Sequence, residues 1–131
     1  MSLATEISNA ELVILKALWQ RAPMYSAEVV AAVQQHEKWH EKTIKTLLNR
    51  LVKKGAVSFE QEGRVYRYHP ELSQAEFQAQ ASQSFVQQVF SGQVSAVVAG
   101  FANQQALSQS DVNSLKAIIS EWEERQGDQH D

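Results

Sequence analysis

Residues 42–55 read KTIKTLLNRLVKKG, and residues 56–70 continue as AVSFEQEGRVYRYHP. In the first stretch, apolar residues recur at the three- and four-residue spacing of a single helix face, which predicts an amphipathic helix. This apolar face consists of Ile44, Leu47, Leu48, Leu51 and Val52. Gly55 suits a left-handed cap, and the two lysines before it suit the negative end of a helix. The predicted helix therefore ends just before Gly55.

The opposite face of this helix is basic and polar. Long cations suit phosphate and guanine, while short polar groups suit base edges and phosphate oxygens. On this reasoning, the base-reading candidates are Thr43, Lys45, Thr46 and Asn49. The phosphate-contacting candidates are Lys42, Arg50, Lys53, Lys54, Arg64 and Arg67. The alternative is a solvated helix face with no ligand, because basic surface helices are common.

Residues 56–70 predict two short strands joined by a turn at residues 61–64. The sequence leaves two registers open for the second strand, which expose either Val65 with Arg67 or Tyr66 with Tyr68 on one face. A basic helix followed directly by a basic hairpin is the layout of a winged helix-turn-helix, whose helix enters the DNA major groove. The hairpin therefore favours nucleic-acid binding over a plain surface helix. A winged module that binds protein or RNA is the alternative.

Two further helices are expected before this stretch. Residues 8–11 form a capping-box pattern, and a helix with an apolar stripe follows and ends near Arg21. Pro23 then breaks the chain, Ser26 is expected to cap a second helix, and Trp39 is expected to plug the core before the basic helix. The order helix, helix, connection, helix, hairpin is the winged arrangement.

Composition supports a small DNA-binding protein. The chain has 131 residues, of which 44% are hydrophobic, so it can bury a core. Its net charge of −3 is unevenly spread: residues 1–70 carry +3 and residues 71–131 carry −6. The chain has no cysteine, which fits a reducing cytoplasm and excludes disulfides and thiolate metal sites. The sequence shows neither a membrane-spanning run nor a signal-peptide pattern, so a cytoplasmic location is expected.

Three amphipathic helices are expected after residue 70. Residues 73–76 form another capping box, Gly92 interrupts the pattern, and Ser108 with Asp111 opens the last helix, whose tail after Glu123 is expected to fray. Their apolar residues have little beside them to pack on, which predicts a homodimer. The dimerisation candidates are Phe77, Phe85, Val89, Phe90, Val94, Val97, Val98, Phe101, Val112, Leu115, Ile118, Ile119 and Trp122. A helical hairpin folded back on the front domain is the alternative.

The expected fold is thus mainly α with a small β-hairpin wing. An N-terminal winged helix-turn-helix is expected in residues 1–70, and a helical C-terminal dimerisation segment is expected in residues 71–131. The sequence contains no recognisable catalytic constellation and no glycine-rich phosphate loop. We therefore expect no enzyme activity and no cofactor.

One motif points to a different chemistry. Residues 36–40 read HEKWH and match H-E-x-x-H, which on a helix would place His36 and His40 on a zinc ion with Glu37 as general base. Charged neighbours and the short chain argue against a peptidase, because such a site needs a substrate cleft. A small zinc hydrolase remains a remote alternative function, and we assign no metal ligand.

The residues quoted above resemble the penicillinase-repressor family, called BlaI/MecI, which also includes copper-responsive CopY repressors. The matching residues are Ile7–Glu11, Leu18–Trp19, Trp39, Lys42–Ile44, Thr46–Leu48, Arg50–Leu51, Lys53–Gly55, Arg64–Tyr66, Tyr68 and Pro70. The resemblance covers nearly the whole chain. It implies a dimeric repressor of a near-palindromic operator, with residues 42–54 in the major groove and the C-terminal helices forming the dimer.

The resemblance also bears on the inducing signal. Copper-responsive members carry a cysteine-rich metal hook, which this chain lacks. Members that respond to β-lactams are cleaved at an Asn-Phe bond in the C-terminal half, in a membrane sensor-protease system. The corresponding bond here is Gly100-Phe101, which keeps the Phe but not the Asn. The resemblance therefore makes Gly100-Phe101 the candidate cleavage site.

Overall fold

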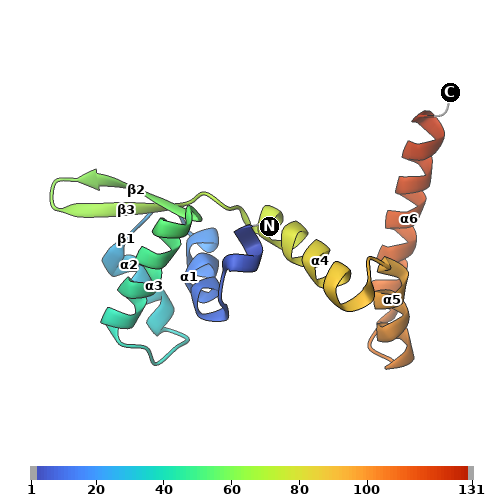
Figure 1. Ribbon diagram of the computed structural model, residues 1–131, viewed down its shortest axis with the longest axis horizontal. Helices are drawn as coiled ribbons and strands as arrows, with labels where there is room; N and C mark the ends of the chain where they lie inside the picture. Colours follow the sequence, from blue (N-terminus) through green and yellow to red (C-terminus); the bar gives the residue numbers. More distant parts are fainter. Residues whose placement is uncertain (1–2, 130–131) are drawn as a thin grey trace. The chain divides into compact units, whose positions relative to one another are not determined.

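The computed structural model describes residues 3–129 and is mainly helical (Figure 1). Its elements run in the order of a 3-10 turn at Leu3–Glu6, then α1 (Asn9–Gln20), β1 (Met24–Tyr25), α2 (Ser26–Gln34), α3 (Glu41–Lys54), β2 (Val57–Glu62), β3 (Val65–Pro70), α4 (Gln74–Phe90), α5 (Val94–Asn103) and α6 (Gln109–Gln129). The expected class, mainly α with a small β wing, is confirmed. Contacts between residues divide the chain into two compact units, one up to Phe85 and one from Val86.

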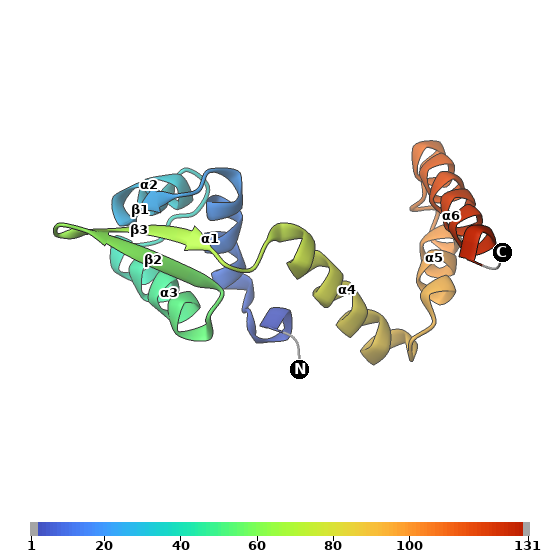
Figure 2. The same ribbon diagram turned by 90° about the horizontal axis from the view of Figure 1, so that it is seen from above.

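The first unit is built around helices α1, α2 and α3, with the sheet beside them (Figures 1 and 2). The fully buried apolar side chains of its core include Ile14, Leu15, Leu18, Val29, Ile44, Leu51 and Ala56. Trp39 packs against this core, as the sequence predicts. The capping box of α1 is also confirmed, because the Ser8 hydroxyl accepts from the Glu11 N–H and the Glu11 carboxylate accepts from the Ser8 N–H.

The cap of α2 differs from the prediction. Tyr25, not Ser26, is the N-cap residue, and its backbone N–H donates to the Glu28 carboxylate at 2.9 Å. Ser26 is already the first helical residue because Met24 and Tyr25 form a short strand. This strand was not predicted, since two residues are too few to show an alternating pattern.

The sheet has three antiparallel strands in the order β1-β3-β2. The register pairs Phe59 with Tyr68, and the ring of Phe59 also lies 4.8 Å from that of Tyr66. The structure therefore selects the register in which Tyr66 and Tyr68 share a face with Phe59. Gly63 occupies the turn between β2 and β3 with a φ of 61°, a backbone conformation that a residue with a side chain would adopt only with strain.

Helix α4 begins within the first unit. The expected capping box is present, since the Ser73 hydroxyl accepts from the Glu76 N–H. The Phe77 ring lies 5.6 Å from that of Trp19, and the Gln80 side chain accepts a hydrogen bond from the Ala4 N–H at 3.0 Å. The contact boundary at Phe85 therefore falls inside α4, later than the functional boundary expected after residue 70.

The second unit contains α5 and α6. Gly92, with φ of 84°, follows the end of α4, as expected from the interrupted pattern. The Ser108 hydroxyl accepts from the Asp111 N–H and so caps α6. The prediction that the tail frays after Glu123 is wrong up to Gln129, where α6 ends, and residues 130–131 lie outside the described part of the chain. Over residues 3–129, no single helix is both long and apolar enough to cross a membrane, although α4 and α5 taken together, with the bend between them, meet the same criteria.

Candidate nucleic-acid interface

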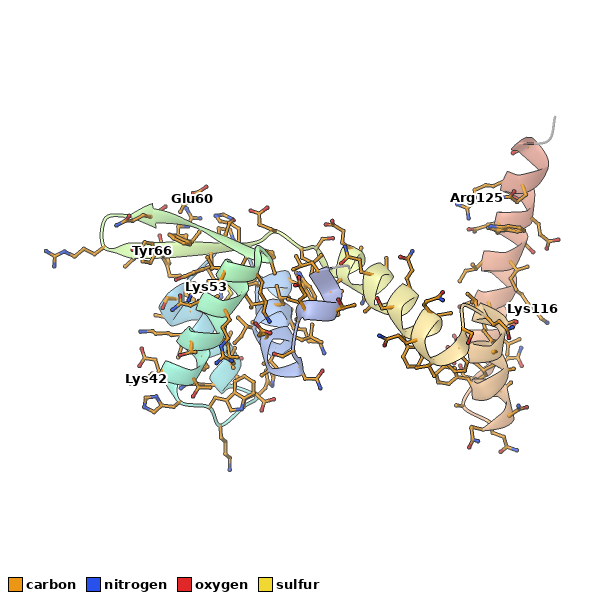
Figure 3. The ribbon with its side chains drawn as sticks, viewed as in Figure 1. Lys42, Lys53, Glu60, Tyr66, Lys116 and Arg125 are labelled. Atoms are coloured by element: carbon orange, nitrogen blue, oxygen red, sulfur yellow. The ribbon has the colours of Figure 1, made fainter. Side chains whose placement is uncertain are left out.

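Helix α3 presents the basic face that the sequence predicts. Its N-terminus is capped by His40, whose Nδ1 accepts a hydrogen bond from the Lys42 N–H at 3.0 Å. Its C-terminus ends at Gly55, which has a φ of 83°. Figure 3 labels Lys42 and Lys53 near the two ends of the helix. The exposed residues of α3 include Lys42, Thr43, Lys45, Thr46, Asn49, Arg50, Lys53 and Lys54.

Two hollows flank the exposed face of α3. One, of about 430 Å³, is lined by the helix itself and its cap, with His40, Lys42, Thr46 and Arg50 among its residues. The other, of about 390 Å³, lies between α3 and the wing. Its lining brings together Lys45, Asn49, Arg64 and Tyr66. Helix and wing therefore contribute cations to one continuous region of the first unit, as a nucleic-acid contact requires.

Ion pairs divide the predicted phosphate contacts into two groups. Lys54 and Arg67 are paired, with Glu11 and Glu62 respectively. Among the base-reading candidates, Lys45 forms an exposed pair with Glu41, whose carboxylate lies 2.8 Å from Lys45 Nζ and one helical turn away. Within residues 3–129, the predicted contacts that make no ion pair are Lys42, Arg50, Lys53 and Arg64. These four cations are the ones available to phosphate without breaking an internal contact.

Lys54 is engaged within the fold. Its Nζ donates to the Glu11 carboxylate and to the Glu6 carbonyl oxygen, both at 2.6 Å. The Glu11 side chain is only 2% exposed. Burial raises the pKa of the Glu11 carboxyl, but hydrogen bonds from Lys54 and Ser8 outweigh it, so the pKa is lowered overall. These contacts hold Lys54 within the fold, and its phosphate contact stays a prediction.

Arg67 is engaged in a cluster on the wing. Its Nη1 donates to Glu62 Oε1 at 2.9 Å, and its guanidinium lies 5.8 Å from the centre of the Tyr25 ring. The Tyr25 hydroxyl donates to the second carboxylate oxygen, Oε2, at 2.7 Å. Hydrogen bonds from Arg67 and then Tyr25 lower the pKa of Glu62. Sequence reasoning missed Tyr25 and Glu62 because the pairing depends on strand β1, which has no sequence signal.

The base-reading candidates lie on the exposed side of α3. The Thr46 hydroxyl donates to the Lys42 carbonyl oxygen at 2.9 Å. That bond uses the hydroxyl proton and leaves the oxygen as an acceptor. Thr46 can therefore accept from an amino group of cytosine or adenine in the major groove.

The zinc motif does not form its required geometry. Helix α2 ends at Gln34 and α3 begins at Glu41, so residues 36–40 lie between helices. His40 also uses Nδ1 to cap α3. In the part of the chain that is described, no three His, Cys, Asp or Glu side chains gather as a metal site would require. The two histidines therefore do not stand one turn apart on a helix.

The dimerisation candidates are mostly exposed apolar residues. Phe101, Ile118, Ile119 and Trp122 are each more than half exposed, although such side chains are usually buried. A hollow of about 410 Å³ between α5 and α6 is lined by Val97, Val98, Phe101, Ala106, Leu107, Leu115 and Ile118, among others. The other exposed or half-buried candidates are Phe85, Val89, Phe90, Val94 and Val112. Phe77 differs from these, because it packs on Trp19 within the first unit.

The candidate cleavage bond lies inside a helix. Gly100 and Phe101 are both exposed residues of α5. A methyl group added at Gly100 would meet no atom within 4 Å other than its chain neighbours and the local backbone of α5. The bond is therefore accessible at the surface of α5, but the helix would have to open locally before a protease could bind it in extended form.

Comparisons with known proteins agree with this geometry. A sequence model described as penicillinase repressor matches residues 7–121. The chain is 33% identical to the penicillinase repressor of Bacillus licheniformis over 92% of this chain and 94% of that protein. It is 26% identical to the methicillin resistance regulatory protein MecI of Staphylococcus aureus strain N315, over 88% of this chain and 94% of that protein.

A solved structure extends the likeness to the fold. The solution structure of the DNA binding domain of the repressor BlaI superposes with a TM-score of 0.52 and is 37% identical, covering 58% of this chain and 93% of that domain. The extent of the family match and the identity to the Bacillus protein lead to one conclusion: this chain belongs to the penicillinase repressor family.

Proposed function

We propose that this protein is a cytoplasmic, non-enzymatic transcriptional repressor that binds a near-palindromic DNA operator as a homodimer. The observation that carries the proposal is the exposed basic face of α3 beside a wing that bears Arg64. In this arrangement α3 enters the major groove, and the wing contacts the flanking backbone. Membership of a family whose named members are repressors supports the same function.

Each part of the interface has a proposed role. Thr43, Lys45, Thr46 and Asn49 read base edges, since they lie along the exposed front of α3. Four unpaired cations contact phosphates: Lys42, Arg50, Lys53 and Arg64. Phosphate contacts position the helix on the duplex, whereas base contacts determine the sequence that is bound.

The dimer is proposed to form through the helices after residue 85. The exposed apolar side chains of α5 and α6 would lose contact with water when a second copy packs on them, which is the usual driving force of association. Two linked winged units would then bind two half-sites whose centres are about 34 Å apart or a multiple of that distance.

Relief of repression is proposed to follow cleavage at Gly100-Phe101 by a membrane sensor-protease system. Glycine weakens a helix by about 1 kcal/mol relative to alanine, so α5 opens more readily at this point. Cleavage would separate α6 from the rest of the chain. Dimer stability and operator affinity would then fall together, although the winged unit would be unchanged.

The proposal is tested by a gel shift with DNA from upstream of the protein's own gene, compared with random duplex and with RNA of the same length. Specific retardation of the upstream duplex, unaffected by a zinc chelator, is expected. Its log affinity should fall by about 0.9 per phosphate contact for each unit of log salt concentration. Preferential binding of RNA, or no retardation by any nucleic acid, would contradict the proposal.

A further inference from the structure

The wing carries two arginines in different electrostatic states. Arg64 follows Gly63 at the turn, is exposed, and makes no ion pair with any of residues 3–129. Arg67 lies three residues further along β3 and donates to Glu62 at 2.9 Å. Resting on the proposed function, we infer that Glu62 occupies the place of a DNA phosphate on Arg67, so that Arg64 alone supplies the phosphate contact of the wing.

The cluster around Glu62 joins all three strands of the sheet. Tyr25 comes from β1, Glu62 ends β2, and Arg67 lies on β3 directly opposite Tyr25 in the register. Each carboxylate oxygen of Glu62 has its own donor: Oε1 accepts from Arg67, and Oε2 accepts from Tyr25 at 2.7 Å. The carboxylate is therefore fixed at both oxygens. Tyr25 is a positioning residue, because it acts on Arg67 through Glu62 and through its ring.

The bonding preferences of Arg67 are already met by this cluster. Carboxylate and phosphate are the two oxyanions that a guanidinium recognises best, and both accept charge-assisted hydrogen bonds. The Tyr25 ring lies 5.8 Å from the Arg67 guanidinium and adds a cation-π contact. A DNA phosphate could engage Arg67 only by displacing Glu62, which would leave that carboxylate near the negative backbone.

This arrangement changes the balance between specific and non-specific binding. Each cation that neutralises a phosphate adds affinity for every DNA sequence, because phosphates carry no sequence information. Because Arg67 is paired with Glu62 and does not contact a phosphate, the affinity that the wing adds for every DNA sequence is lower. The base contacts of α3 are unaffected. The Tyr25–Glu62–Arg67 cluster therefore makes operator binding depend more on α3, and it holds the strands that carry Arg64.

The decisive experiment measures the salt slope, meaning the magnitude of the fall of log affinity with log salt concentration, for full-length variants on one random duplex. The double variant Glu62→Gln with Arg67→Gln removes an internally neutral pair, so its slope should equal that of the wild type. Arg64→Gln is the matched control, and it should lower the slope by about 0.9. Circular dichroism and thermal unfolding confirm that each variant is folded.

The single variant Glu62→Gln tests whether the carboxylate restrains Arg67. Its slope should rise by about 0.9, because the freed guanidinium can then pair with a phosphate. Glu60→Gln removes the same charge from the same strand. Glu60 lies opposite Arg67 in the register, but the hydrogen bond of Arg67 goes to Glu62, and the Glu60 carboxylate lies 3.9 Å from His69 Nε2. Glu60→Gln should therefore leave the slope unchanged. Figure 3 labels Glu60 on the wing.

A measurement without DNA separates this inference from the proposed function. Arg67→Gln, and to a smaller extent Tyr25→Phe, should raise the pKa of Glu62 toward its ordinary value in an NMR carboxyl titration, because each variant removes a hydrogen-bond donor. If the wild type fails to bind DNA, the proposed function fails, while this titration still decides whether the cluster exists. Three results would overturn the inference: a Glu62 pKa that is the same in Arg67→Gln as in the wild type, an unchanged salt slope for Glu62→Gln, or a salt slope for the double variant that falls as far as that of Arg64→Gln.

Discussion

Lys54 Nζ lies 2.6 Å from Glu11 Oε1, although the two residues are 43 positions apart in the chain. The same carboxylate accepts from the Ser8 N–H and so caps α1. One buried acid therefore fixes the start of α1 and the end of α3 together. This contact joins the local capping signal of α1 to the end of the proposed DNA-reading helix α3, whose buried face also packs into the core.

Acid should weaken the fold through Glu11. Folding lowers the pKa of the Glu11 carboxyl below 4.5, so Glu11 stabilises the folded state. That contribution to the free energy of unfolding is fully present above the pKa of Glu11 in the unfolded chain. That contribution is lost as the pH falls below 4.5 and through the folded pKa. Urea unfolding of the wild type and of Glu11→Gln, from neutral pH down to about pH 3, should show a stability gap that shrinks with acid. A gap that stays constant with pH would assign the stability to other groups.

Lys53 and Lys54 are neighbours with different expected roles. Lys53→Ala should lower the salt slope of DNA binding by about 1, with little change in stability. Lys54→Met should instead lower stability by about 1–3 kcal/mol, because the buried Glu11 carboxylate loses its charged partner. Salt titrations and urea unfolding of both variants measure the two effects. The reverse pattern would return Lys54 to the phosphate-contacting group.

Thr46 should contribute to the choice of sequence. Thr46→Ala removes an oxygen that can accept from a base, so the free-energy gap between operator and random DNA should narrow by about 1 kcal/mol. Fluorescence anisotropy with both duplexes measures the gap. Leu47→Ala is the control on the buried face, and it should instead lower stability by about 2–5 kcal/mol. An equal loss of affinity for both duplexes with Thr46→Ala would make Thr46 a backbone contact.

Two truncations should separate folding from dimerisation. A chain ending at residue 85 keeps the Trp19–Phe77 contact and the Ala4–Gln80 hydrogen bond, so it should fold as a stable monomer. A chain ending at residue 72 loses both contacts and should be less stable. Operator affinity of the longer fragment should fall on the order of 10²-fold, because the two half-sites are no longer linked. Sedimentation of that fragment as a dimer would place the interface in the winged unit.

Gly100→Ala should protect the protein from the proposed cleavage. The added methyl group meets no atom within 4 Å beyond the local backbone of α5, so the fold should be kept. Alanine should also stabilise α5 by about 1 kcal/mol, which makes local opening rarer. Blots of induced cells should show the intact repressor persisting longer than in the wild type. Equal cleavage of both proteins, or no cleavage of the wild type, would count against a switch at this bond.

Much of the fold could be predicted from short-range patterns. The apolar face of α3, its Gly55 cap, the capping boxes at Ser8 and Ser73, and the start of α6 at Ser108 all lie where the sequence predicts them. These features depend on residues within about one helical turn of each other, so the local sequence alone is enough to predict them. The exposed basic residues of α3 follow from the same periodicity.

Only the tertiary structure decided which of those cations are free. The sequence presents Lys53 and Lys54 as equivalent, and likewise Arg64 and Arg67, yet one member of each pair is held by a distant or cross-strand carboxylate. Strand β1, the buried Glu11 and the first turns of α4 against Trp19 were equally invisible. Each depends on elements far apart in sequence coming together, and a periodic pattern shows which face of a helix is buried but not which residue it will meet.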